Sequence, residues 1–503
     1  MQGHKHFADH AVLCFRLSER VPKHNLYRRL AEVLDWDFLY AQTRPFYSHT
    51  GQPSLDPVVF FKLMLVSRLE NLVSDRRLIE HCSLRLDILY FLGYELDEVL
   101  PWHSTISRTR QLYSAAVFEC LFEHVFAQCV AAGLVTGHTQ AVDSAPVKAN
   151  ASLENLSEKQ AIEATASTLH VAGESAPAVA APAPAAQQAS PAHHLRRVAA
   201  AHARYCRQDS GPLGRDRTRA RLLSNKTHYS PADPDARISV KPGKARALNY
   251  LCSMAVDEAH GVISHVQADF ADRRDSTLLP SIMAPLHQRL LGHERPVVDV
   301  VADTNYSNGL NYALLEACGI TPWIPVFGQY KPQIEGFTYE QETDCFICPA
   351  GKKLPFKRFD VDPDGRLSKR YSAATGDCRR CPRKPTCIPK SKSRKITRTA
   401  YDAQYRRALA RQQSRLGQHM RRLRQRTVEP VFGSLLQHYG LRRVNTRGRS
   451  SAHKTMLLTA IAFNLKKLLK HQSTQTQCLA IALPVPAPAG PFFTRLTALQ
   501  SPS

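Results

Sequence analysis

Apolar residues recur at helical spacing through most of residues 25–136, which predicts an all-helical N-terminal region. Asp56 and Pro57 form a favourable N-cap and first-turn pair in front of the apolar run VVFFKLMLV. Further helical patterns follow at SDRRLIEHCS, LRLDILYFLGY, HSTISRTRQLY (with Ser104 or Thr105 as cap) and SAAVFECLFEHVFAQCVAAGL. The polar, basic helix over 104–111 suits a helix-turn-helix-like DNA-binding module, although any small helical bundle would show a similar pattern.

After residue 138 the pattern changes to strands alternating with helices. HTQAVDSAPVKA predicts a short strand ending in Asp143, and LNYLCSMAVD and VISHVQAD predict an antiparallel hairpin with Gly261 in its turn. A helix (DSTLLPSIMAPLHQRLLG), a β-branched strand ending at Asp303 (RPVVDVVAD), a helix (NYALLEACG) and a strand (ITPWIPVF) follow. This order predicts an α/β fold with the mixed sheet of an RNase H-like core, in which the fourth strand lies beside the first.

The 503 residues are too many for one typical core, so several modules are expected. We expect a helical DNA-binding domain over 1–136, a catalytic domain over 137–475 and a flexible, Pro-rich tail over 476–503. Two segments interrupt the catalytic domain: a helical and Ala/Pro-rich linker at about 151–222, and a Cys-rich insertion at about 340–395. Long Arg-rich helices and the amphipathic helix HKTMLLTAIAFNLKKLLK are expected near the C-terminus.

The charge of the chain indicates a polyanionic partner. Lys and Arg number 67 against 43 Asp and Glu, which leaves a formal net charge of +24. Nucleic acid accounts for such a surplus better than a ribosome-like or membrane-surface role, because phosphate neutralisation releases counterions. No apolar run reaches the roughly 18 residues of a membrane span. The start, MQGHKHFADH, lacks the apolar segment of a signal peptide, so a cytoplasmic location without a membrane partner is expected.

Two aspartates at strand positions are the first candidates for chemistry. Divalent-metal phosphoryl transfer needs carboxylates brought together, because hard cations prefer oxygen ligands. In an RNase H-like sheet, Asp143 on the first strand and Asp303 at the end of the fourth would face each other. Asp143 could instead be a turn residue before Ser144 and Pro146, and Asp303 could instead cap a helix. Asp299 on the same strand is a competitor, but it lies inside the apolar run and not at the strand end, where α/β sites gather.

Glu429 stands out by composition. Between Tyr401 and Ser450 there are 12 Arg and only two acids, Asp402 and Glu429, and no acid follows Glu429. It could simply neutralise a neighbouring Arg, or it could be a third metal ligand on a helix whose arginines hold phosphates. Pro430 disfavours helical geometry at Glu429, so a helix is expected to begin or kink there.

Five of the 13 cysteines cluster in two CxxC pairs and one further thiol. Paired knuckles of this kind are typical of structural zinc, although the 29 residues between them exceed the usual 15–20. The alternative is a set of reduced thiols in a degenerate insertion. The expected ligands are Cys345, Cys348, Cys378 and one of Cys381 or Cys387.

In order and spacing, several motifs resemble those of bacterial insertion-sequence transposases of the DDE type, in the group called "eleven-eighty-two". The motifs are LDPVVFFKLMLVSRLENLVSDRRLIEHC, WHSTISRTR, VDSAPVKANAS, SNKTHYSPADPDARISVKPGK, ADFADRRDS, VADTNYSNG and VEPVFG. The resemblance runs from about residue 20 to 470, excluding the Ala/Pro linker. It implies that Asp143, Asp303 and Glu429 are the first, second and third acids and hold two Mg²⁺ or Mn²⁺ ions.

The resemblance also implies a mechanism and partners. The enzyme would nick double-stranded DNA at terminal inverted repeats and transfer the freed 3′-OH to target DNA, as at least a dimer in the bacterial nucleoid. Basic residues expected to contact DNA are Arg422, Arg426, Arg442, Arg443, Lys241 and Lys244. Related transposases often place Tyr, Arg and Lys around the third acid, whereas Gln437 stands roughly where the Lys is expected. Trp323 could stack on a flipped base, but a core position in its strand is favoured.

Two other functions share parts of this pattern. A domesticated or truncated copy would bind DNA as a repressor without chemistry, but the presence of all three acids favours the enzyme. An RNase H-like nuclease of repair or RNA processing would not need the Arg-rich C-terminal helices or the helical N-terminal region.

Overall fold

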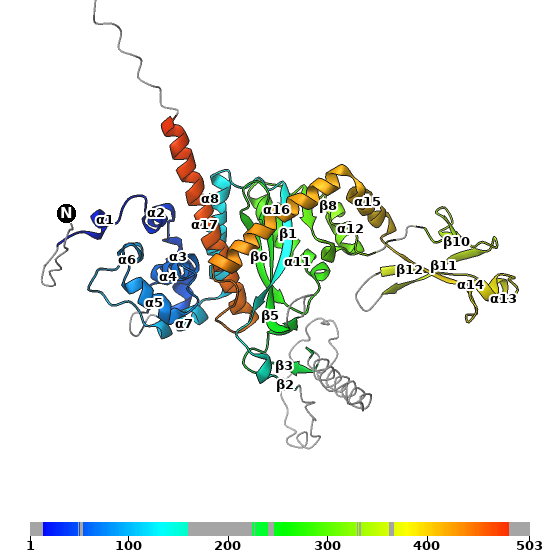
Figure 1. Ribbon diagram of the computed structural model, residues 1–503, viewed down its shortest axis with the longest axis horizontal. Coiled ribbons are helices and arrows are strands. Elements are labelled where there is room, and N and C mark those ends of the chain that lie inside the picture. Colours follow the sequence, from blue (N-terminus) through cyan, green and yellow to red (C-terminus); the bar gives the residue numbers. More distant parts are fainter. Residues whose placement is uncertain are drawn as a thin grey trace, which may run out of the picture.

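The computed structural model describes residues 14–48, 50, 54–158, 224–225, 227–239, 246–328, 330, 333–361 and 367–481, with side chains as far as 472. Most of the predicted Ala/Pro linker, both Lys241 and Lys244, and the tail beyond residue 481 lie outside these residues. Figure 1 shows a helical region at one end, a mixed sheet in the centre and a second, smaller sheet at the other end.

The N-terminal region is helical, as the apolar spacing predicts. Its helices are α1 (Leu17–Arg20), α2 (Leu26–Val33), α3 (Phe38–Thr43), the 3-10 turn η1 (Arg44–Phe46), α4 (Pro57–Leu69), α5 (Asp75–Ser83), α6 (Leu86–Leu92), α7 (His103–Leu112) and α8 (Ala115–Ala131). The predicted cap of α4 is confirmed, because Asp56 Oδ1 accepts from the amides of Val58 and Val59 at 2.6 and 3.1 Å.

The predicted cap of α7, Ser104 or Thr105, is wrong by two or three residues. Trp102 is the N-cap, since its carbonyl accepts from the amides of Thr105 and Ile106 at 2.9 and 3.3 Å and so closes the first turn. Ser104 therefore lies inside the helix. In the part of the chain that the structure describes, no single helix is long and apolar enough to cross a membrane; α7 and α8 pass that test only as a pair bent by 91°.

The central sheet has the strand order of an RNase H-like core. Its strands are β1 (Thr139–Lys148), β4 (Arg237–Ser239), β5 (Ala247–Asp257), β6 (Ile263–Phe270), β7 (Asp299–Ala302) and β8 (Thr321–Trp323). Antiparallel β5 pairs with β1, β4 and β6, whereas β7 runs parallel to both β1 and β8. The predicted hairpin, the helix after it and the adjacency of first and fourth strands are thus confirmed.

β1 does not end in Asp143 as predicted but continues to Lys148. Ser144 and Pro146 form no turn, because β5 pairs with β1 along its length, from Gln140↔Asp257 to Lys148↔Asn249. On the side of β1 that faces β7, the ladder stops at Val142. Pro146 lies beyond this point, where β1 has no ladder partner on that side, so the N–H group that proline lacks is not needed there.

Helices surround this sheet and connect it to the N-terminal region. They are the long α11 (Asp275–Gly292), the 3-10 turn η4 (Thr304–Tyr306), α12 (Gly309–Ala317), α15 (Asp402–Gln413), α16 (Arg415–His438) and α17 (Arg449–Ile481). α16 packs on β1, β5, β7 and β8, and Figure 1 shows it crossing the sheet. α17 packs against α4, α8 and β6, so one apolar core runs from Tyr27 to Leu469 through both regions.

Two smaller sheets complete the fold. A short 3-10 turn (η2, Leu153–Asn155) precedes the two-stranded sheet of β2 (Ser157–Glu158) and β3 (His228–Tyr229). The Cys-rich insertion forms an antiparallel sheet of β9 (Thr338–Glu340), β10 (Cys345–Ile347), β11 (Lys353–Val361), β12 (Leu367–Ser372) and β13 (Lys395–Thr399), with α13 (Thr375–Arg379) and α14 (Lys384–Cys387) between its last two strands. It has a separate core that includes Phe346, Leu354 and Tyr371.

Candidate active site

Asp143 and Asp303 lie side by side on neighbouring strands. The parallel ladder pairs Thr139 with Asp299 and ends at Val142 with Ala302, and the two acids are the next residue of each strand. Since neighbouring strands are about 4.8 Å apart, the register alone places the two carboxylates at one edge of the sheet. Both are partly buried.

Asp303 also has the capping role that was its alternative interpretation. Its Oδ1 accepts from the backbone N–H of Asn305 at 2.9 Å, and its Oδ2 accepts from the Asn305 side-chain amide at 3.1 Å. These bonds fix Asp303 at the start of η4. Capping and metal binding are compatible, because a carboxylate has more lone pairs than these two donors use.

Glu429 is linked to Asp143 by Arg424. Arg424 donates from Nη1 to Asp143 Oδ2 at 2.9 Å and from Nη2 to Glu429 Oε1 at 3.1 Å. The Arg424 side chain is 13% exposed and that of Glu429 is 56% exposed. One guanidinium thus connects the helix carrying the third acid to the strand carrying the first.

A helix start at Glu429, one of the two outcomes expected there, is wrong. α16 runs from Arg415 to His438 with Glu429 and Pro430 in its interior. Its buried face includes Val428, Val431 and Leu435, so burial against the sheet outweighs the hydrogen bond that Pro430 cannot donate.

A buried series of side-chain hydrogen bonds begins next to Asp143 and crosses from β1 to β5 and β6. The Tyr306 hydroxyl is 2.6 Å from Oγ of Ser144, the residue after Asp143. Ser144 donates to Ser253 Oγ at 3.0 Å, and Ser253 donates to Asp269 Oδ2 at 2.7 Å. Since the Ser144 proton is directed to Ser253, Tyr306 donates its own proton to Ser144.

Tyr306 stays protonated at this position. Burial raises its pKa well above the ordinary value, and the carboxylates of Asp275, Asp143 and Asp303 raise the pKa further. Asp275 is the first residue of α11, which is held to η4 by the Asn311 amide; this amide donates to the carbonyls of Ser276 and Tyr306 at 2.8 and 2.9 Å. A third aspartate therefore contributes to the negative field around Tyr306, and the sequence reasoning missed it.

The donor set fits a hard divalent cation, because Asp143, Asp303 and Glu429 offer only carboxylate oxygens. The first two are adjacent, and the third is connected to them through Arg424. Within the described residues no three His, Cys, Asp or Glu side chains already form a metal-binding group. The roles of these three acids as ligands stay a prediction.

Asp299 and Trp323 are hydrogen-bonded to each other. The indole Nε1 of Trp323 donates to Asp299 Oδ1 at 2.7 Å, and the Trp323 ring packs against the main core. Asp299 lies four residues before Asp303, at the opposite end of β7. It is the competitor that the geometry disfavours, and the core position favoured for Trp323 is confirmed.

The predicted DNA-contacting arginines are exposed. Arg426 donates to Glu258 at 3.2 Å and Arg443 donates to Asn150 at 2.8 Å, while Arg422 and Arg442 are open to solvent. Their contact with DNA stays a prediction, and Lys241 and Lys244 lie outside the described residues.

The five insertion cysteines occupy different surroundings. Cys345 is buried and donates to Glu340 at 3.4 Å, on the face of β10 opposite Phe346. Cys348 and Cys378 pack against the small core of the insertion, and Cys381 and Cys387 follow in the loop and helix after it. No three of them form a metal-binding group within the described residues, so zinc stays a prediction that metal analysis of the purified protein can test.

Arg424 is the functional residue that the sequence reasoning missed, in favour of Arg422 and Arg426. A signal was present, because Arg424 lies one helical turn from both Met420 and Val428, two buried residues of α16. An arginine in the apolar stripe of a helix needs a partner for its charge. Arg422 and Arg426, in contrast, lie on the solvent side of the helix.

Two segments of the chain match known families. Residues 15–112 match the Transposase domain (DUF772), and residues 347–469 match the Transposase DDE domain. Both are transposase domains. A search of curated proteins finds no match. The two matches agree with the resemblance to insertion-sequence DDE transposases and support a transposase function. The second match contains Glu429 and Arg424, and a DDE domain indicates an enzyme that cleaves or transfers DNA.

Proposed function

We propose that this chain is an active transposase that nicks the terminal inverted repeats of its element and joins the freed 3′-OH to target DNA. The observation that carries the proposal is the convergence of three acids from separate elements. The β1–β7 register places Asp143 beside Asp303, and Arg424 connects Asp143 to Glu429.

Two phosphoryl transfers make up the reaction. In the first, a water oxygen attacks a phosphodiester at the element end, the P–O3′ bond breaks and a 3′-OH is released. In the second, this 3′-OH attacks a target phosphodiester, and the target's own 3′ oxygen leaves. Divalent metal ions bound by the three carboxylates would activate the attacking oxygen and stabilise the leaving one.

The residues of the chain divide the remaining tasks. Asp303 is fixed by its capping bonds to Asn305, and Arg424 holds Glu429 near Asp143. Arg422 and Arg426, exposed on the same helix, lie where they can neutralise phosphates of the bound strand. Transfer of two ends at once requires at least a dimer on DNA, which belongs to the proposal.

An end-labelled duplex carrying the inverted repeats that flank the gene tests this function. With Mg²⁺ we expect nicks at the repeat ends and joined products with a target plasmid, and loss of both with a chelator. Asp143→Asn should bind the duplex but not cut it. Absence of nicking by the wild-type protein, or nicking that survives Asp143→Asn, would overturn the proposal. Binding without nicking would identify the repressor alternative.

A further inference from the structure

We propose that Tyr306 is a positioning residue that holds the first two acids at a fixed separation. This inference rests on the proposed function and concerns a side chain that carries no carboxylate. The parallel pairing of β1 and β7 ends at Val142 and Ala302, one residue before Asp143 and Asp303. Strand pairing therefore aligns the two acids, but their separation depends on contacts beyond the end of the ladder.

The Tyr306 hydroxyl makes such a contact. Tyr306 is the last residue of η4, the turn for which Asp303 is the N-cap. Its hydroxyl lies 2.6 Å from Oγ of Ser144, the residue that follows Asp143 on β1. One hydrogen bond thus joins the turn that begins at the second acid to the strand that carries the first.

Ser144 is held from the other side by the sheet. It pairs with Ser253 across β1 and β5, and its Oγ donates to Ser253 Oγ at 3.0 Å. Ser253 donates to Asp269 Oδ2 at 2.7 Å, and the Gln267 amide donates to the same oxygen at 2.8 Å. Ser144, Ser253 and Asp269 are all buried, so water does not replace a bond that is lost. The partner of the Tyr306 hydroxyl is therefore fixed relative to three strands.

The Tyr306 end of the contact is restrained as well. Its side chain is fully buried, and its carbonyl accepts from the Asn311 amide of α12 at 2.9 Å. The same amide donates to the carbonyl of Ser276 on α11 at 2.8 Å. Because η4 is anchored to two helices, Tyr306 cannot follow β1 if that strand moves away.

The contact acts on the carboxylates through the backbone. Successive side chains of a strand point to opposite faces, so the Tyr306 hydroxyl approaches Ser144 from the face opposite to the Asp143 carboxylate. Neighbouring carboxylates such as those of Asp143 and Asp303 repel each other. A hydrogen bond that opposes their separation keeps the pair close to the geometry that a shared cation requires, before the ion binds.

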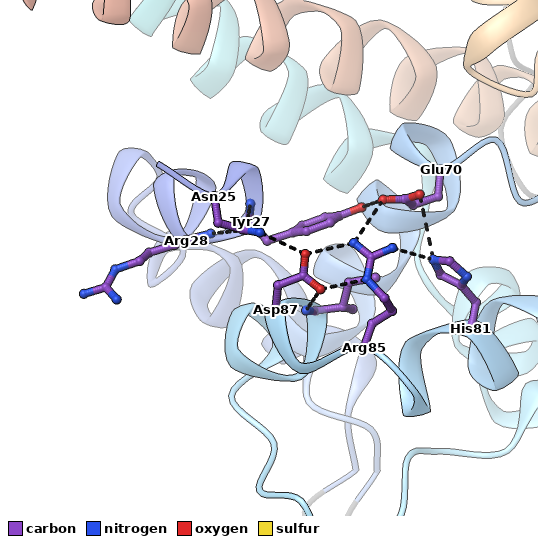
Figure 2. Close-up of polar contacts among 8 residues, drawn as sticks. Asn25, Tyr27, Arg28, Glu70, His81, Arg85 and Asp87 are labelled. Carbon is purple, nitrogen blue, oxygen red and sulfur yellow. Dashed lines mark hydrogen bonds and ion pairs between the residues drawn. The ribbon is translucent and has the colours of Figure 1, made fainter. Parts of the chain in front are cut away.

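Two other buried tyrosine hydroxyls hold different parts of the chain. Figure 2 shows Tyr27 of α2, whose hydroxyl donates to Glu70, directly after α4, at 2.6 Å. The Tyr312 hydroxyl of α12 donates to the carbonyl of Ile324, directly after β8, at 3.2 Å. These bonds stabilise the packing of helices and a loop, whereas the Tyr306 bond ends on the strand of the first acid.

Calorimetric titration of the full chain with Mn²⁺ in the absence of DNA tests this proposal. Tyr306→Phe removes the hydroxyl and keeps the ring, and it should weaken Mn²⁺ binding about tenfold, a usual cost of losing a contact that orients metal ligands. A high Mn²⁺ concentration should restore most of its nicking rate, because the variant retains all three acids. The matched controls, Tyr312→Phe and Tyr27→Phe, each lose one buried hydroxyl and should change Mn²⁺ affinity by less than about twofold, since they lie outside the contact.

A second variant removes the other partner of the bond. Ser144→Ala should weaken Mn²⁺ binding to a similar extent, and its combination with Tyr306→Phe should bind no more weakly than the weaker single variant, because both changes remove one interaction. Unchanged affinity in either single variant, additive losses in the double variant, or an equal loss in Tyr312→Phe would overturn the positioning role. Wild-type protein that binds no Mn²⁺ and nicks no duplex carrying the repeats would instead overturn the proposed function itself.

Discussion

At the scale of single residues, the three acids differ in what holds them. Asp143 is part of a paired strand, Asp303 is fixed by its capping bonds, and Glu429 is held by one guanidinium on an otherwise exposed helix face. Arg424 therefore has two effects. It brings Glu429 toward Asp143, and it competes as a cation for the same oxygens that a metal would use.

Arg424→Gln separates these two effects. The variant should bind Mn²⁺ about tenfold more tightly than wild type in the absence of DNA, because one oxygen of Asp143 and one of Glu429 no longer pair with a competing cation. It should also cut DNA more slowly, since Glu429 loses its connection to Asp143. Calorimetric titration and the nicking assay measure the two outcomes. Arg415→Gln, at an exposed position at the start of the same helix, is the control and should change neither. Weaker metal binding by Arg424→Gln would contradict the account.

The sequence singles out the three candidate acids but not the contact that connects two of them. Asp143 and Asp303 follow from strand order, and Glu429 from its isolation among arginines and from the VEPVFG motif. Arg424 is five residues before Glu429, a spacing that does not place two side chains on one helix face. The bridge exists because Arg424 donates to Asp143 on β1 with one nitrogen and to Glu429 with the other, and the contact with β1 is a tertiary one that local spacing does not encode.

At the scale of elements, two proline signals were misleading for one physical reason. Pro146 makes a turn plausible and Pro430 favours a helix start or a kink, yet β1 and α16 continue through both. Local preference is worth at most a few kcal/mol, and pairing or burial of a whole element outweighs it. The hairpin of β5 and β6, the helix α11 and the strand β7 follow the apolar pattern, because there local and tertiary preferences agree, whereas the three-residue strand β4 is not predicted by it.

His265 on β6 makes the packing of neighbouring helices sensitive to pH. Burial, with smaller contributions from Arg289 and His453, lowers its pKa to about 4 against the opposing effects of Gln267 and Glu119. In the unfolded chain the pKa is near 6.5, so between these values the unfolded state binds the proton more readily. The free energy of unfolding is therefore highest above about pH 6.5 and falls by about 2 kcal/mol on reaching pH 5.

His265→Gln should remove most of that fall. Urea unfolding of both proteins at pH 8 and pH 5 measures it, and the variant should lose about 2 kcal/mol less than wild type between the two. Equal losses in the two proteins would show that His265 is not the group that titrates.

At the scale of the whole molecule, the helical region and the sheet share one apolar core. α17 packs against α4 and α8 on one side and β6 on the other. Asn71 and Arg68 also donate to the carbonyls of Gln437 and Gly440, at the end of the helix that carries Glu429. The region proposed to hold DNA is therefore in direct contact with the helix of the third acid.

This shared core predicts that residues 1–136 will not fold alone. Without α17 the fragment leaves apolar faces of α4 and α8 in water, which removes much of its stabilising burial. Thermal unfolding followed by circular dichroism should show a broad, non-cooperative change for the fragment and a sharp one for the full chain. A sharp transition for the fragment near the full-length midpoint would contradict the shared core.

The most direct test of the central claim compares two aspartates of one strand. Asp303→Asn and Asp299→Asn make the same chemical change four residues apart on and directly after β7, in a chain that is otherwise identical. With Mg²⁺ and a duplex carrying the inverted repeats, we expect nicking to be abolished by Asp303→Asn and retained by Asp299→Asn. Nicking that persists in Asp303→Asn, or is lost only in Asp299→Asn, would contradict the assignment of the acids.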